Sequence, residues 1–147
     1  MSDNIKIYDK VGGRPTLEKV HKIFYDKVYE HPWMKKFFEG IDQKHIEDQQ
    51  SDFLSKALGG PNIYSGALPV AAHKHMMVTE ELFELRHQML KESLIEVGVD
   101  EESMKYWLNI DKSFKDAIVK KSTGDLQKRF FTDEFVIHPN PEDKKAA

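Results

Sequence analysis

The chain has 147 residues, of which 39% are hydrophobic and 32% charged, and its formal net charge is -3. This length suits a single domain with one core, and no apolar run approaches the ~18 residues that cross a bilayer, so we expect no membrane as partner. The small net charge gives no reason to expect a nucleic acid as partner, and the absence of cysteine excludes disulfides, thiolate metal sites and a cysteine nucleophile.

The first half of the chain is predicted to hold two helices. The first, residues 15–30, opens on a proline that suits an initial helical turn and ends before Pro32, because the residue preceding a proline avoids the helical region. A short aromatic connection, residues 33–38, follows. The second helix runs from the capping residue Asp42 to Leu58, where a Gly-Gly-Pro sequence stops it.

The second half is predicted to hold two further long helices after a mostly irregular segment. Residues 62–77 are weakly patterned, with at most one short helix at 70–74. Residues 79–98 and 100–121 carry apolar side chains at helical spacing, and each stretch opens with a capping residue followed by acids that suit the helix dipole. No segment alternates with period two, so the fold class is all-α, with four principal helices paired before and after the loop.

We divide the chain into a domain of residues 1–122 and a C-terminal extension of residues 123–147. The extension is too apolar to be left in water, and we expect it to pack across the domain or between subunits. Its large apolar residues are Leu126, Phe130, Phe131, Phe135, Val136 and Ile137. The start of the chain lacks the apolar stretch of a secretory signal, so the expected location is cytoplasmic.

Two polar side chains lie on or beside the apolar helix faces. Gln50 lies about 40° around its helix from Ile46, among hydrophobic neighbours. Its amide therefore needs a partner, which is a neighbouring loop, another side chain or a bound ligand. Tyr25 lies at the flank of the apolar face of the first helix, where its hydroxyl is either structural or reaches a polar pocket.

Histidine is the softest metal ligand that this composition offers. His73 follows two alanines that would let a flat cofactor approach closely, although taken alone it also fits a surface loop. His87 is the rival ligand because it lies on the core face of the third helix, where a hydrogen-bonded core histidine is the alternative. The others are interpreted as surface or loop residues, or as pointing elsewhere: His21, His31, His45, His75 and His138.

Six short motifs follow one another along the chain: YDKVGG (residues 8–13), FYDKV (24–28), KFFEGID (36–42), QQSDFLSKALGGPNIYSG (49–66), AAHKHM (71–76) and LIEVGV (94–99). Together they resemble the group I truncated hemoglobins over residues 8 to 119, without an insertion. A glycine pair alone would say little, but the ordered set is specific. The resemblance implies a truncated globin fold, a two-over-two helical sandwich around heme b.

The resemblance also assigns roles to individual residues. His73 corresponds to the proximal histidine, Tyr25 to the distal tyrosine, and Gln50 to a distal glutamine that hydrogen-bonds a ligand of the iron. Gln49 occupies a site that carries a histidine or a lysine in some relatives, and Ile46 occupies the usual distal gate. The implied heme pocket is lined by Phe24, Phe38, Phe53, Leu54, Tyr64, Arg86 and Leu90.

Two charged residues depart from the family pattern. Arg86 stands where relatives have an apolar heme contact, and Asp111 interrupts the apolar face of the fourth helix. Each either turns outward or approaches a heme propionate.

The resemblance implies reversible binding of dioxygen, nitric oxide and carbon monoxide at an iron held by His73. Some members of the family also convert nitric oxide to nitrate, which here would require an external reductase, so an enzymatic activity is left open. Two alternatives remain. One is a heme protein for electron transfer or redox sensing with six-coordinate iron, and the other is a heme-free helical interaction module.

Overall fold

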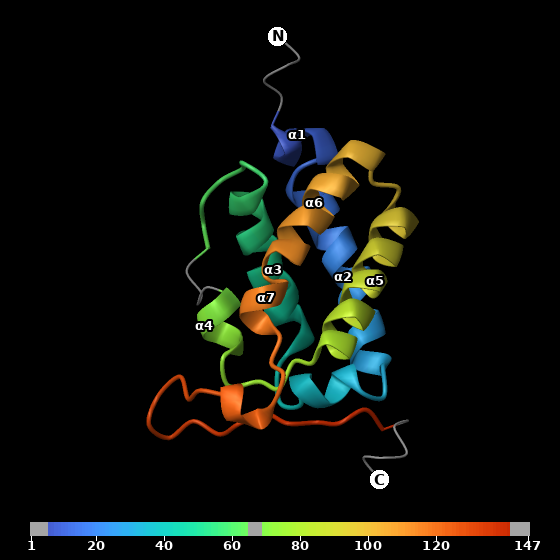
Figure 1. Ribbon diagram of the computed structural model, residues 1–147. Coiled ribbons are helices and arrows are strands. Elements are labelled where there is room, and N and C mark those ends of the chain that lie inside the picture. Colours follow the sequence, from blue (N-terminus) through green and yellow to red (C-terminus); the bar gives the residue numbers. More distant parts are fainter. Residues whose placement is uncertain (1–5, 65–68, 142–147) are drawn as a thin grey trace.

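The structure, a computed structural model, describes residues 6–64 and 69–141 and consists of helices joined by irregular segments (Figure 1). In chain order the elements are α1 (Ile7–Val11), α2 (Arg14–Glu30), the 3₁₀ helix η2 (Met34–Phe38), α3 (Gln43–Ala57), α4 (Pro69–His73), α5 (Glu80–Val97), α6 (Glu101–Ser113), α7 (Lys115–Ile118) and the 3₁₀ helix η3 (Thr123–Asp125). Within the described ranges no strand forms, and one isolated β-bridge pairs Met76 with Val136. The all-α prediction is confirmed.

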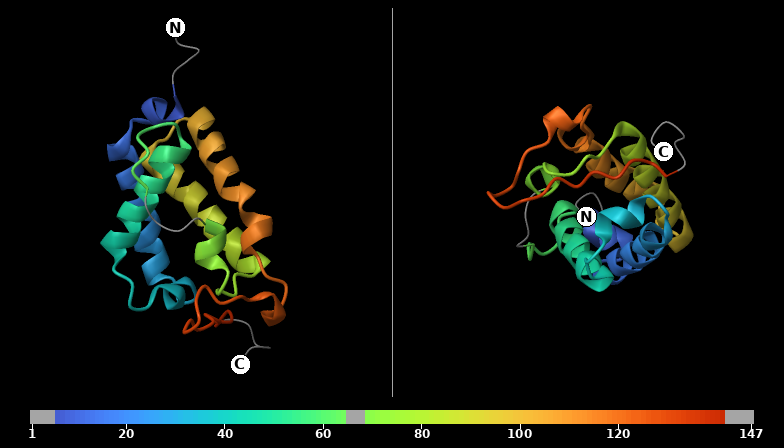
Figure 2. Two further views of the ribbon diagram at one scale, coloured as in Figure 1. Left: turned by 90° about the vertical axis from the view of Figure 1, so that its left-hand side faces the viewer. Right: turned by 90° about the horizontal axis from the view of Figure 1, so that it is seen from below.

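The four long helices form two layers. Helix α2 packs against α3, α5 packs against α6, and α2 also contacts α5 across the interior. Figure 2 shows α2 and α3 on one side and α5 and α6 on the other, which is the predicted two-over-two arrangement. The short helix α4 lies against α7 at the edge of the second layer. None of the helices in the described ranges combines the length and apolar character that a membrane-spanning segment needs.

The starts of three long helices follow from their capping residues. Asp42, Thr79 and Asp100 each accept a hydrogen bond from the backbone N–H three residues later, at 3.0, 3.2 and 3.0 Å respectively. These bonds satisfy amides that have no partner within the helix. At the other end of α5, Gly98 adopts a left-handed conformation with φ of 85°, which glycine tolerates without strain.

The fourth long helix is shorter than predicted. It ends at Ser113 and is followed by the single turn of α7, after which Val119 is extended, with φ of -69° and ψ of 133°. The Lys120 amide then donates to the carbonyl of Val78 at 2.8 Å. A contact with a distant segment thus replaces the helical hydrogen bond that the periodicity predicted.

The C-terminal extension runs across one end of the helical bundle (Figures 1 and 2). Leu126 is buried there and Val136 is half-buried. The other large apolar side chains of the extension are exposed in the single chain: Phe130, Phe131, Phe135 and Ile137. Packing between subunits stays a prediction, whereas packing across the domain is wrong for these four. The physical reason is that the extension is attached largely through backbone hydrogen bonds, which leave part of its side chains pointing outward. Residues 142–147 lie outside the described residues.

Candidate functional site

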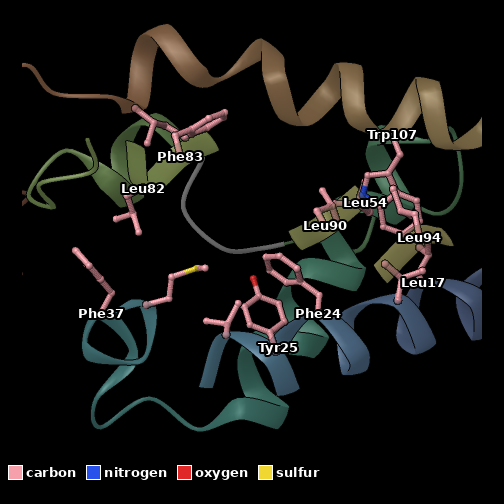
Figure 3. Close-up of a cluster of buried hydrophobic side chains, with 14 of the residues drawn as sticks. Leu17, Phe24, Tyr25, Phe37, Leu54, Leu82, Phe83, Leu90, Leu94 and Trp107 are labelled. Carbon is pink, nitrogen blue, oxygen red and sulfur yellow. The ribbon is translucent and has the colours of Figure 1, made fainter. Parts of the chain in front are cut away.

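Tyr25 lies in α2 with only 7% of its surface exposed. Its ring meets those of Phe24 and Phe38 edge-on, with centroids 4.8 and 5.8 Å away. The hydroxyl has no hydrogen bond to any described residue, and Figure 3 shows it turned away from its own helix. Burial raises the pKa of the Tyr25 hydroxyl, so the group keeps its proton at ordinary pH. A protonated hydroxyl without a protein partner can donate to a bound ligand.

Helix α3 has one deeply buried face and one half-buried face. The deeply buried face includes Ser51 and Ser55, whose small side chains let α3 approach α2 closely. His21 of α2 lies there too, with its Nδ1 atom 2.8 Å from the Ser51 hydroxyl, so the prediction of a surface histidine is wrong. Burial, with help from the nearby Arg14 charge, lowers the pKa of His21 to about 3.

The half-buried face of α3 carries the distal residues that the sequence singled out. It comprises Ile46, Gln49, Gln50 and Phe53. The sequence placed Gln50 in the middle of the core-facing surface, whereas the serine face occupies that position and Gln50 lies at its edge. Its amide has no hydrogen bond to another described residue. This face therefore offers apolar surface and a free amide beside the core.

Aromatic and aliphatic side chains continue the wall of the candidate pocket. The Phe53 ring lies 5.4 Å from Tyr64 and 6.0 Å from Phe114, measured between centroids. Leu54 and Leu90 are buried in the same hydrophobic core as Tyr25, and Figure 3 shows both near Phe24. Sequence reasoning missed Phe114 as a wall residue, because its only signal was a place on the apolar face of the fourth helix.

His73 is the last residue of α4 and is half-buried. Its carbonyl accepts hydrogen bonds from the Met76 amide at 2.9 Å and from the Lys120 ammonium at 2.7 Å. Because α4 lies against α7, His73 belongs to the layer opposite the one that carries Tyr25 and Gln50. This is the placement expected of a proximal ligand facing distal donors.

Arg86 and Asp111, which depart from the family pattern, pair with each other. The Arg86 guanidinium donates to one carboxylate oxygen of Asp111, and the His87 Nδ1 atom lies 2.7 Å from the other. The guanidinium also lies over two rings, with its central carbon 5.3 Å from the Phe83 centroid and 5.8 Å from the Phe24 centroid. The charge of Asp111 thus has two partners, and one of these, His87, is half-buried and hydrogen-bonded through its Nδ1 atom.

The charges of Arg86 and Asp111 also act on Tyr25. Burial alone would raise the pKa of Asp111, but Arg86 and His87 outweigh burial and lower it, so the carboxylate stays ionised. Arg86 and Asp111 act on Tyr25 with opposite signs. The pair therefore presents little net charge to the Tyr25 hydroxyl.

These residues fit a heme. A heme site needs an axial ligand such as an imidazole, apolar walls, and donors on the opposite side if the bound gas is to be stabilised. The described residues supply His73 in one layer and, in the other, the unpartnered Tyr25 hydroxyl beside the half-buried face of α3. His73 is the candidate ligand because it is the histidine that the family resemblance assigns to the iron and it lies in the layer opposite Tyr25 and Gln50.

Comparisons with known proteins identify relatives of this chain. Residues 6–120 match the family model described as bacterial-like globin. The chain is 39% identical over 93 residues to a group 1 truncated hemoglobin from Tetrahymena pyriformis, covering 63% of this chain and 77% of that protein. It is 34% identical over 98 residues to a group 1 truncated hemoglobin from Mycolicibacterium paratuberculosis, covering 67% and 72%.

The fold is also similar to solved structures. The crystal structure of the Tetrahymena pyriformis truncated hemoglobin in its Fe(III) form matches with a TM-score of 0.72 at 32% identity. The match covers 80% of this chain and 100% of that one.

Proposed function

Because the chain belongs to the bacterial-like globin family, among the group 1 truncated hemoglobins, we propose that it binds dioxygen reversibly with His73 as proximal ligand and Tyr25 and Gln50 as distal donors. As a globin it binds heme and takes diatomic gases as ligands. His73 then holds the heme, while Tyr25 and Gln50 set how tightly the gas is bound.

Heme supplies the iron that binds the gas and gives the gas partial negative charge. The Tyr25 hydroxyl, protonated because burial raises its pKa, donates a hydrogen bond toward that charge. The Gln50 amide is a second donor from α3. Each such bond contributes on the order of 1–3 kcal/mol in a site that excludes water. Two donors predict slow release of dioxygen.

The observation that carries this proposal is the state of Tyr25. The side chain is buried, its hydroxyl keeps its proton, and the hydroxyl has no hydrogen bond to a described residue. No protein group competes for this donor among the described residues, so it is available to a polar ligand in the pocket.

The test is stopped-flow release of dioxygen from the ferrous protein. Tyr25→Phe and Gln50→Leu should each release the gas about 5-fold to 100-fold faster, the equivalent of one lost hydrogen bond. Tyr29→Phe is the matched control on the same helix, because its hydroxyl donates to the Ile41 carbonyl at 2.9 Å instead. Release rates that stay at the wild-type value in both distal variants would contradict the proposed roles.

Conversion of nitric oxide to nitrate is proposed as a further reaction of the same pocket. Forming one nitrate from one dioxygen and one nitric oxide takes one electron, which the ferrous iron of a bound heme would supply, so turnover would need an external reductase. Mixing the oxygenated protein with nitric oxide should yield one nitrate per heme. Recovery of nitric oxide instead of nitrate would restrict the function to gas binding.

The alternative with six-coordinate iron requires a second protein ligand on the distal side. None of the distal positions on α3 carries an imidazole or an amine, since they hold Ile46, Gln49 and Gln50. An amide is a poor ligand for heme iron. We therefore expect the distal position to stay open for a gas.

A further inference from the structure

Residues 73–78, which join α4 to α5 and begin with the proposed iron ligand, are held by residues from the C-terminal side of α7. We propose that residues 120–138 form a clamp that fixes the backbone of residues 73–78 and thereby sets the position of the His73 imidazole. This inference rests on the proposed role of His73. It concerns residues that lie almost wholly beyond the globin match, which ends at residue 120.

Lys120 is the first anchor of the clamp. Its backbone amide donates to the Val78 carbonyl at 2.8 Å, and its ammonium donates to the His73 carbonyl at 2.7 Å and to the Ile118 carbonyl at 2.7 Å. Lys120 is only 7% exposed. A buried ammonium is stable only when its donors are satisfied, so these carbonyls and the lysine hold one another in place. Lys120 thus forms hydrogen bonds with the backbone at both ends of residues 73–78.

The second anchor consists of backbone hydrogen bonds from the extension itself. The Gln127 amide donates to the Lys74 carbonyl at 2.9 Å, and the Val136 amide donates to the His75 carbonyl at 3.0 Å. In return the Met77 amide donates to the Val136 carbonyl at 2.8 Å. Together with the contacts of Lys120, five backbone groups within residues 73–78 are bonded to the clamp.

The clamp is fastened at its far end to the opposite layer. The indole of Trp33 donates to the His138 carbonyl at 2.5 Å, and the His138 ring meets Phe37 edge-on with centroids 5.0 Å apart. Between the anchors, buried Leu126 and the Arg129–Asp133 ion pair fix the course of the extension. The clamp therefore ties residues 73–78 to the connection between α2 and α3, as its path across the end of the bundle shows (Figure 2).

Helix α4 needs such support. It has five residues. A helix of that length is unstable alone, because it forms too few hydrogen bonds to offset the free-energy cost of nucleation. Its position must come from tertiary contacts, which are those with α7 and with the clamp. Loosening the clamp should therefore let the His73 imidazole move relative to the heme, which changes the strength of its bond to the iron.

The test compares the heme-loaded wild type with Lys120→Met, with Val136→Pro, which removes the amide that bonds His75, and with a chain that ends at Ser122. The control is Phe131→Ala, since this side chain of the extension is 94% exposed. The readouts are the iron–histidine stretching band of the ferrous gas-free protein by resonance Raman, the rate of heme transfer to excess apomyoglobin, and amide hydrogen exchange.

We expect the stretching band to shift or broaden and heme transfer to accelerate about tenfold in the three clamp variants, the equivalent of losing one or two hydrogen bonds. Amides of residues 74–78 should exchange faster while those of α2 stay protected, and Phe131→Ala should match the wild type. An unchanged band together with unchanged exchange at residues 74–78 in Lys120→Met and Val136→Pro would overturn the clamp. Failure of the proposed function is distinguishable, because the wild type itself would then show no gas-sensitive heme spectrum.

Discussion

Replacing Asp111 by asparagine is expected to destabilise the protein, because the buried carboxylate serves Arg86 and His87 together. Asparagine keeps the shape of the side chain and removes its charge. The side chain of Asp111 is 14% exposed and that of Arg86 is 32% exposed. The pair therefore lies between a surface ion pair, which contributes about 0–1 kcal/mol, and a buried one, whose disruption costs about 3–5 kcal/mol.

An intermediate loss of about 2 kcal/mol corresponds to a fall in Tm of about 4–8 °C for a chain of this length. Thermal unfolding followed by circular dichroism measures it. Asp48→Asn is the matched control, because its partner Lys44 is an exposed residue one helical turn away, and it should change Tm very little. Equal Tm values for the two variants would refute the reasoning.

The Asp111 effect should also depend on pH in a defined direction. The pKa of Asp111 is lowered in the folded protein, so its stabilising contribution is complete above the unfolded value of about 3.9. The contribution disappears as the pH falls through the folded value. The stability difference between wild type and Asp111→Asn should therefore be constant from neutral pH down to about 5 and shrink below about 4. A difference that grows on acidification would show that another group is responsible.

Two further predictions concern residues away from the pocket. Gly60→Ala would place a Cβ atom 2.5 Å from the Tyr8 ring and should cost about 1–3 kcal/mol of unfolding free energy; Gly124→Ala, whose Cβ meets nothing nearer than 3.5 Å, is the control in the same denaturant titration. His21, with its pKa lowered to about 3 by burial, should keep constant ring proton shifts from pH 8 to 5 in NMR spectra of the carbon monoxide form. Because the imidazole of His21 binds a proton below about pH 6.5 only in the unfolded chain, the free energy of unfolding should also fall as the pH drops below that value. A His21 ring that titrates near pH 6.5 would contradict its burial.

The long helices could be predicted because their signals are local. A capping side chain lies three residues from the amide that it bonds, and the periodicity of one face is visible within a single window. The end of the fourth helix could not be predicted in this way. Lys120 leaves the helix to bond Val78, a residue 42 positions earlier (120 − 78) whose proximity no local pattern reports.

In the candidate site too, local signals could be read from the sequence and contacts between distant residues could not. Gln50 and Tyr25 stood out because polar groups interrupted or flanked an apolar face, and the motifs then supplied their roles. The burial of His21 was missed because its partner, Ser51, is on another helix, and small serines look like surface residues in a periodicity count. Asp111 broke the pattern for a reason that only the structure reveals, since its two partners lie on α5.

The most direct test of the account is the visible spectrum of the purified protein, ferric and ferrous, with and without carbon monoxide, for wild type and His73→Ala. His87→Ala and the exposed His45→Ala serve as controls. We predict a gas-sensitive heme spectrum for the wild type and both controls, a lost or altered one for His73→Ala, and its restoration by added imidazole. A wild-type spectrum in His73→Ala would remove the proximal role from His73, and a wild type that takes up no heme would contradict the function itself.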